Sequence, residues 1–266
     1  MIELAPHHKI GLPLAAPVIP AAGFWGYGQN RYAPLIDAAR FGAIVTNPIT
    51  LRPQKSMPAA VSEVSGGVIL HAPPGNFGVK KIIRSNRKFW RHSPVPVIAH
   101  LPADTPADLR RTVRALASTE IIAGLEIGFT RADTPADIQA IIRSATESEL
   151  PVLAKLPADA GADTFSAALD TGADALVLAF SPPASVLVGE NMRHGDFLGW
   201  GIAPVALPRI AAVRQLFPDV PLIAGSGIHS PADAQSYLRA GATAIQLDTI
   251  IFINPIQVQQ ILEETQ

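Results

Sequence analysis

Polar residues that could carry chemistry lie at the ends of several short apolar runs in this 266-residue chain. His100 is near the end of one run, Lys155 is near the end of a second, and Thr249 follows a third. An imidazole can transfer a proton, an ammonium group can bind an anion, and a hydroxyl group can donate to a phosphate. If these runs are parallel strands, their carboxyl ends meet and the three side chains share one site.

The stretch Val220–Phe252 has the most specific pattern in the chain. An apolar run ends in a Gly-Ser-Gly turn at 225–227, a capped helix follows over Ser230–Ala240, and a second apolar run ends just before Thr249. Backbone N–H groups at two such strand ends converge with the start of a following helix and form a phosphate site, which is typical of the last two strands of a (β/α)8 barrel. The pattern therefore indicates a barrel that binds a phosphorylated ligand here. A tight turn without a ligand is the structural alternative.

The rest of the chain supplies the elements that such a barrel needs. The predicted strands are Pro17–Ala21, Ala43–Thr46, Pro96–Leu101, Gly124–Ile127, Val152–Leu156, Ala175–Ala179, Leu222–Ala224 and Ala244–Leu247. The predicted helices are Arg31–Arg40, Val79–His92, Thr105–Ser118, Pro135–Glu147, Ala162–Thr171, Pro204–Phe217, Ser230–Ala240 and Ile256–Glu264. Eight strands alternating with helices is the count that closes a barrel.

We therefore predict an α/β fold, a single (β/α)8 TIM barrel domain over residues 1–266. An N-terminal β-hairpin over Ile2–Leu14 precedes the core. Long loops follow strands 2 and 6: the first is an irregular stretch over 51–94 that ends in the basic helix, and the second is Phe180–Ile202. A cap device recurs at Thr105, Thr134 and Ser230, each followed by proline and, three residues on, by aspartate.

Composition excludes several classes of site. There is no cysteine, so disulfides, thiolate metal sites and a cysteine nucleophile or base are excluded. No pair of histidine and acidic residues has metal-ligand spacing, so no metal is expected. A net charge of −1 gives no general attraction to nucleic acid or to a membrane. With no signal peptide and no apolar stretch long enough to span a bilayer, a cytoplasmic protein is expected.

Four features of the sequence are consistent with both a structural and a functional role. Lys155 either points into the barrel mouth at an anion or pairs with a carboxylate, and Glu126 could be that partner or support a loop. His100 is equally consistent with a structural residue and with a base, and His71 is similar. The basic stripe on Val79–His92 is typical of a solvated helix face, with a phosphate-rich partner as the alternative.

An ordered series of segments resembles the class 1 dihydroorotate dehydrogenases, which are flavin barrels that bind FMN. GLPLAAPVIPAAGFWGYG is similar to their opening hairpin and first strand, and FGAIVTNPITL to their second strand. PVLAKL, GADALVL, APVALPRI and PLIAGSGIHSPADAQSYLRAGATAIQLDT follow in the family's order. The resemblance assigns these residues to the FMN cofactor: Ala21, Ala22, Gly23, Asn47, Lys155, Gly199, Gly225, Ser226, Gly227 and Thr249. Lys155 matches a lysine near the flavin's pyrimidine edge, and Thr249 matches a threonine that reaches the phosphate.

Several positions depart from the family's pattern. The family has lysine at Asn47, asparagine at His100 and at Phe180, and glycine at Asp248. After strand 4 it has a run whose cysteine takes the substrate's proton, but here the run is Gly-Phe-Thr-Arg-Ala-Asp at 128–133. The base and most asparagines that hold an orotate-like ring are therefore missing, which leaves Thr130, Ser181 and His100 as candidate catalytic residues.

The leading hypothesis is a dihydroorotate dehydrogenase-like FMN oxidoreductase that acts on a small-molecule substrate, with dihydroorotate itself in doubt. Asp248 near a phosphate dianion would weaken FMN binding, so the cofactor could also be weakly held or lost. One alternative is a non-redox barrel that binds another phosphorylated ligand. Another is a non-catalytic relative that has lost FMN and binds a partner through Val79–His92. The resemblance also implies a homodimer.

Overall fold

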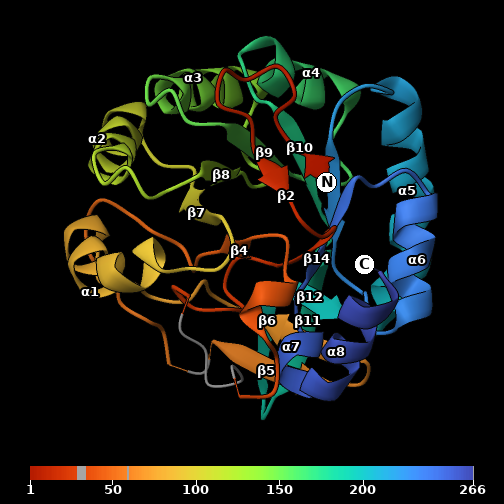
Figure 1. Ribbon diagram of the computed structural model, residues 1–266. Coiled ribbons are helices and arrows are strands. Elements are labelled where there is room, and N and C mark those ends of the chain that lie inside the picture. Colours follow the sequence, from red (N-terminus) through yellow and green to blue (C-terminus); the bar gives the residue numbers. More distant parts are fainter. Residues whose placement is uncertain (29–33, 59, 266) are drawn as a thin grey trace.

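The computed structural model describes residues 1–28, 34–58 and 60–265 (Figure 1). Within these ranges, eight parallel strands form one sheet in the order β3-β14-β13-β10-β9-β8-β7-β4. Their bounds are β3 (Val18–Pro20), β4 (Ile44–Val45), β7 (Val97–Pro102), β8 (Gly124–Gly128), β9 (Val152–Pro157), β10 (Ala175–Ala179), β13 (Leu222–Gly225) and β14 (Ala244–Leu247). The Gly42 N–H donates to the Val18 carbonyl at 2.8 Å and brings the two edge strands together. The predicted barrel is confirmed.

Helices surround the barrel (Figure 1). They are α1 (Val79–Arg91), α2 (Pro106–Ala117), α3 (Pro135–Thr146), α4 (Ala162–Asp170), α5 (Ala203–Leu216), α6 (Pro231–Arg239), α7 (Ile250–Ile253) and α8 (Pro255–Glu264). Their apolar faces pack against the outward-facing strand residues in the main core. Every helix among the described residues is too short or too polar to span a lipid bilayer.

The N-terminal hairpin closes one end of the barrel. Its strands β1 (Ile2–Glu3) and β2 (Pro13–Leu14) pair antiparallel, as predicted. Leu12 and Leu14 are buried against inward-facing strand residues. Leu12 lies beside Gly124 at the start of β8, so the hairpin covers the amino ends of the strands. The opposite end, where the strands finish, is left for the site.

The three predicted helix caps are present. The hydroxyls of Thr105, Thr134 and Ser230 each accept the backbone N–H of the aspartate three residues later. At Thr134 the aspartate also reaches back to the cap N–H, which completes a capping box. These caps fix the residues at which α2, α3 and α6 begin, directly after the loops that follow β7, β8 and β13.

Both long loops contain strands that the sequence analysis missed. The first holds the hairpin β5 (Val61–Val64) and β6 (Gly67–Leu70), and the second holds β11 (Pro183–Val188) and β12 (Asn191–Gly199). These four described strands form a second sheet in the order β11-β12-β6-β5, beside α7 and α8 in Figure 1. His71 links the two hairpins: its ring lies 2.8 Å from the Ser62 hydroxyl and 2.8 Å from the His194 carbonyl. Its role here is structural.

The predicted helix Arg31–Arg40 is wrong over its described part. Residues 34–40 contain no α-helix, only a 3-10 turn η1 at Ala38–Arg40, and residues 31–33 lie outside the described ranges. Pro34 removes a backbone donor within the expected helix. Asp37 then caps the short turn by accepting the Ala39 N–H at 2.9 Å.

Arg214, near the end of α5, clamps the two loops that lead into the last strands. Its guanidinium donates to the carbonyls of Gly241 (2.9 Å) and of 217, 218 and 220 (3.1, 2.7 and 2.8 Å), and to the Thr243 hydroxyl (3.2 Å). Because a planar fork reaches several acceptors at once, this one side chain fixes the starts of β13 and β14.

We expect Arg214→Met to destabilise the fold by at least about 2 kcal/mol, because charge-assisted hydrogen bonds to several carbonyls are lost together. Arg214→Lys should recover less than half of that loss, since an ammonium group cannot bridge both loops. Urea unfolding followed by far-ultraviolet circular dichroism measures both. The exposed Arg143→Met serves as the control; equal stabilities of the two methionine variants would contradict the clamp.

Candidate functional site

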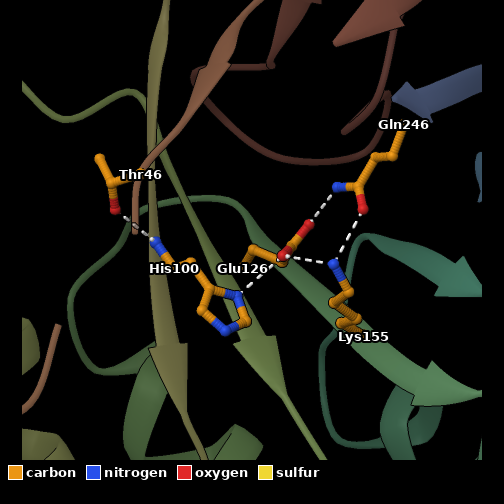
Figure 2. A network of polar contacts seen from close by, with 5 residues as sticks. All are labelled: Thr46, His100, Glu126, Lys155 and Gln246. Atoms are coloured by element: carbon orange, nitrogen blue, oxygen red, sulfur yellow. Dashed lines mark hydrogen bonds and ion pairs between the residues drawn. The ribbon is translucent and has the colours of Figure 1, made fainter. Parts of the chain in front are cut away.

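A buried ionic network lies inside the barrel at the ends of four strands (Figure 2). The Glu126 side chain on β8 is completely buried. Its carboxylate Oε1 lies 2.8 Å from Nδ1 of His100 on β7 and 3.3 Å from Nζ of Lys155 on β9. Gln246 on β14 donates to the other carboxylate oxygen and accepts from Lys155 at 2.9 Å. The four side chains therefore satisfy one another across the barrel.

The network holds Glu126 in its ionised form. Burial alone raises the pKa of a carboxyl group, but here the Lys155 ammonium and the hydrogen bonds from His100 and Gln246 outweigh it. The pKa of Glu126 falls to about 2. Glu126 is therefore a fixed negative charge at neutral pH and cannot serve as a proton donor there.

Lys155 also faces a cavity. A pocket of about 160 Å3 is lined by Ala21, Ala22, Phe24, Leu70, Lys155, Leu178, Ala179, Ser181, Asp196, Leu198, Gly225, Ser226, Gln246 and Asp248. An apolar pocket of about 400 Å3 adjoins it, sharing Ala22, Phe24, Leu70 and Leu198, and continues under β5 and β6 to Gly23 and Thr249. Pockets that hold small ligands span roughly 300–1,000 Å3, so the two together have the volume of a ligand site.

The backbone of the predicted phosphate turn has a conformation that lets a neighbouring group come close to it. Ser226 and Gly227 both have positive φ, +71° and +80°. A side chain at Gly227 would lie 2.8 Å from the Ala203 nitrogen, so glycine is required there. The Ser226 carbonyl accepts the Tyr237 hydroxyl at 2.6 Å. This strained conformation is held by the helices around it.

Asp248 changes the other half of that turn. Its Oδ1 accepts the Thr249 N–H at 2.6 Å and the Thr249 hydroxyl at 3.1 Å. Its Oδ2 is buried and makes no hydrogen bond with any described residue. Burial raises the pKa of Asp248, and the nearby His229 and the Thr249 hydrogen bonds offset only part of that rise. The nearby Ser226 side chain also lowers the Asp248 pKa, without making a hydrogen bond of standard geometry to Oδ2.

The remaining cofactor candidates divide into two groups. Ala21, Ala22 and Gly225 line the small cavity, and Gly23 lines the apolar one, with open space where a side chain would stand. Two others serve the loops instead. The Asn47 side chain accepts the Gly26 N–H at 3.1 Å, and Gly199 packs so closely on Gly66 that an added Cβ would lie 2.1 Å from its carbonyl oxygen.

The three candidate catalytic residues are not brought together. Ser181 lines the small cavity with Lys155. His100 does not line that cavity; it is 9% exposed, and its ring is hydrogen-bonded to Glu126. Thr130 is exposed, and its hydroxyl donates to Asp133 at 2.8 Å within its own loop.

Two polar cavity residues were not found by sequence reasoning. Gln246 is a polar residue inside the apolar run AIQL, which is a signal of an inward-facing role that could have been used. Asp196 comes from β12, in a loop where no strand was predicted. The part of the chain that the structure describes holds no cluster of three or more His, Asp or Glu side chains that could bind a metal.

The sequence profile of the family described as Dihydroorotate dehydrogenase matches residues 7–266. The chain belongs to the dihydroorotate dehydrogenase family. The protein called dihydroorotate dehydrogenase B (NAD(+)), catalytic subunit, from Desulforudis audaxviator is 33% identical over 92% of this chain and 86% of its own length. Its namesakes from Caldicellulosiruptor saccharolyticus and Geotalea uraniireducens are 30% and 29% identical, each over 95% of this chain and over 90% and 89% of their own lengths.

Dihydroorotate dehydrogenase B proteins of this family are FMN-binding flavoproteins. The residues of this chain fit the ring of that cofactor: a cation at a cavity lined by Ala21, Ala22 and Gly225 suits a planar group that gains negative charge. The phosphate end fits less well. Both Thr249 donors, which would face a phosphate, are directed at Asp248.

We expect Glu126→Gln to destabilise the fold by about 3 kcal/mol at pH 7, because it leaves the Lys155 ammonium without its buried counter-charge. The pKa of Glu126 lies near 2, below its ordinary 4.5. Its contribution to the free energy of unfolding is therefore complete above about pH 4.5 and is lost as pH falls toward 2. Urea unfolding at several pH values should show the two proteins converging below pH 4.5.

The exposed Asp170→Asn is the control for that comparison, with an expected change within about 0.5 kcal/mol. A Glu126→Gln protein as stable as the parent at pH 7 would show that the network does not hold the barrel mouth together.

Proposed function

We propose that this chain is an FMN-dependent oxidoreductase of the dihydroorotate dehydrogenase type that acts on a small substrate other than dihydroorotate. One observation carries the proposal. Lys155 is held by Glu126 and Gln246 at the floor of a cavity whose lining includes Ala21, Ala22 and Gly225, residues that the family resemblance assigns to the flavin. A bound flavin supplies a hydride acceptor, and a fixed cation beside it stabilises the charge that develops.

The substrate side differs from the family's pattern. The family's cysteine base is absent, and Thr130 is occupied by Asp133. Instead Ser181 and Asp196 line the cavity that Lys155 faces. Burial raises the pKa of Asp196, with Arg131 opposing that rise, and a carboxylate with a raised pKa is a better proton acceptor. We propose that Asp196, with Ser181 beside the same cavity, takes the substrate's proton, while His100 positions Glu126.

The direct test uses the purified full chain. A yellow protein with releasable FMN supports the cofactor, and anaerobic mixing with dihydroorotate tests the substrate. We expect no bleaching by dihydroorotate and bleaching by another cyclic C–H donor from a small panel of dihydropyrimidines and related rings. A colourless protein that gains no thermal stability from FMN would refute the proposal, because a ligand of the native state must stabilise it.

The positive-φ turn at Ser226 and Gly227 also suits a second candidate, a barrel that binds a different phosphorylated ligand without redox chemistry. Partner binding through the exposed cations of α1 is the third candidate, and charge reversal at Arg84, Arg87 and Arg91 tests it. A homodimer in the cytoplasm, as the sequence analysis expects, is part of the leading proposal. Sedimentation equilibrium measures whether the chain is a dimer.

We expect loss of the Lys155 charge to lower the reduction potential of bound FMN by about 30 mV or more, since tenfold in a two-electron equilibrium corresponds to about 30 mV. The change is best made as Lys155→Met in a Glu126→Gln background, so that no buried carboxylate is left unpaired. Glu126→Gln alone is the matched control. Dye-linked equilibration measures both potentials, and equal values would mean that Lys155 does not face the ring.

A further inference from the structure

The turn that should receive a phosphate already holds a carboxylate. In this family the N–H and hydroxyl of the residue at Thr249 are expected to reach the phosphate, but here both donate to Oδ1 of Asp248, at 2.6 and 3.1 Å. The Thr249 hydroxyl also lies 3.1 Å from Nε2 of His229. An ionised Asp248 therefore competes with an incoming phosphate for its donors and repels it.

The second carboxyl oxygen of Asp248, Oδ2, can become a hydrogen-bond donor to a phosphate when the group is neutral. The residue is 2% exposed, it lines the small cavity, and its Oδ2 makes no hydrogen bond of standard geometry with any described residue, the nearby Ser226 side chain included. An ionised, buried oxygen without a donor is costly. In the neutral acid, the same oxygen carries a proton and can donate it to an acceptor in the cavity. A phosphate oxygen is such an acceptor.

Groups on each neighbouring element influence this carboxyl group. His229, in the loop before α6, favours its ionised form, and Asp233 and Tyr237 stand on α6 beside it. Across the cavity lie Lys155 on β9 and Asp196 on β12. Lys155 is already paired with Glu126, and the imidazole of His229, whose pKa is lowered by burial, is directed at Thr249. Burial is the largest of these influences, and it raises the pKa of Asp248.

We propose that Asp248 couples binding of the flavin's phosphate to uptake of one proton. The neutral carboxyl group donates from Oδ2 to a phosphate oxygen, whereas the ionised group keeps the Thr249 donors and excludes the dianion. The proton comes from solvent or arrives on the phosphate, and the complex holds one proton more than free protein and dianionic FMN. This inference rests on the proposed flavin site and names the residue that sets its affinity for a phosphorylated cofactor.

The test measures dissociation constants for FMN and for riboflavin, which lacks the phosphate, between pH 6 and 9. The native chain and Asp248→Asn are compared, because asparagine keeps an acceptor for Thr249 and supplies a permanent donor. At pH 6 the two should bind FMN within about threefold. At pH 8 the variant should bind it at least tenfold tighter, since one linked proton changes affinity by up to tenfold per pH unit. The asparagine variant also corrects for the titration of the phosphate, whose second pKa is about 6.

Riboflavin lacks the phosphate, so it reports any effect of Asp248→Asn on flavin binding in general. The riboflavin dissociation constants of the native chain and of Asp248→Asn should agree within about twofold at every pH. His229→Asn tests whether the neighbouring imidazole causes the pH dependence. This variant should keep the pH dependence of FMN affinity that Asp248→Asn loses. If Asp248→Asn does not fold, calorimetry of the native chain in buffers of different protonation heat still counts the protons taken up with each flavin. We expect one more proton with FMN than with riboflavin at pH 8.

The role of Asp248 would be overturned if the ratio of FMN affinities between Asp248→Asn and the native chain did not change with pH. Equal proton uptake with FMN and riboflavin would overturn it as well. Either result would leave the flavin site intact. Loss of the pH dependence in His229→Asn would assign the effect to the imidazole instead. If neither flavin binds either protein at any pH, the proposed function fails and this inference fails with it.

Discussion

The buried carboxylate of Glu126 is the constraint on which the mouth of the barrel depends. Removing a charge from water costs several kcal/mol, so a completely buried glutamate survives only where its partners stand in fixed places. Those partners come from three other strands, and His100 is the direct cross-strand neighbour of Glu126 in the β7–β8 register. A slip of one residue would turn every side chain of a strand to the opposite face, so the network also fixes strand register.

The second sheet turns this network into the floor of an enclosed site. Two hairpins from loops that are far apart in the sequence meet where Leu70 on β6 pairs with Asp196 on β12. Leu70 and Leu198 from this sheet stand between the small cavity and the apolar one. The barrel therefore supplies the charged groups from rigid strand ends, while the inserted sheet supplies apolar cover and one carboxylate.

The sequence was sufficient where structure depends on neighbours along the chain. Apolar runs predicted all the barrel strands, and the Thr134 cap was visible in four residues. It was insufficient where the partner is distant. Two strands of the second sheet, β5 and β11, alternate between exposed and half-buried residues, and β6 pairs with β12 from the other long loop. Lys155 could be singled out as a lone charge in an apolar strand, but its contact with Gln246 depends on the order of strands around the barrel.

Two buried carboxyl groups at this end of the barrel have opposite surroundings, and the contrast shows which part of the site is complete. Both oxygens of Glu126 are bonded, and its pKa is lowered to about 2. Asp248 has one bonded oxygen and one without a partner, and its pKa is raised. A fully satisfied network needs no ligand to be stable. Oδ2 of Asp248, in contrast, has no hydrogen bond of standard geometry from the described residues, so a ligand can still add a partner there. The floor of the site is therefore built in advance, whereas the end at Asp248 keeps a polar atom that a ligand can pair.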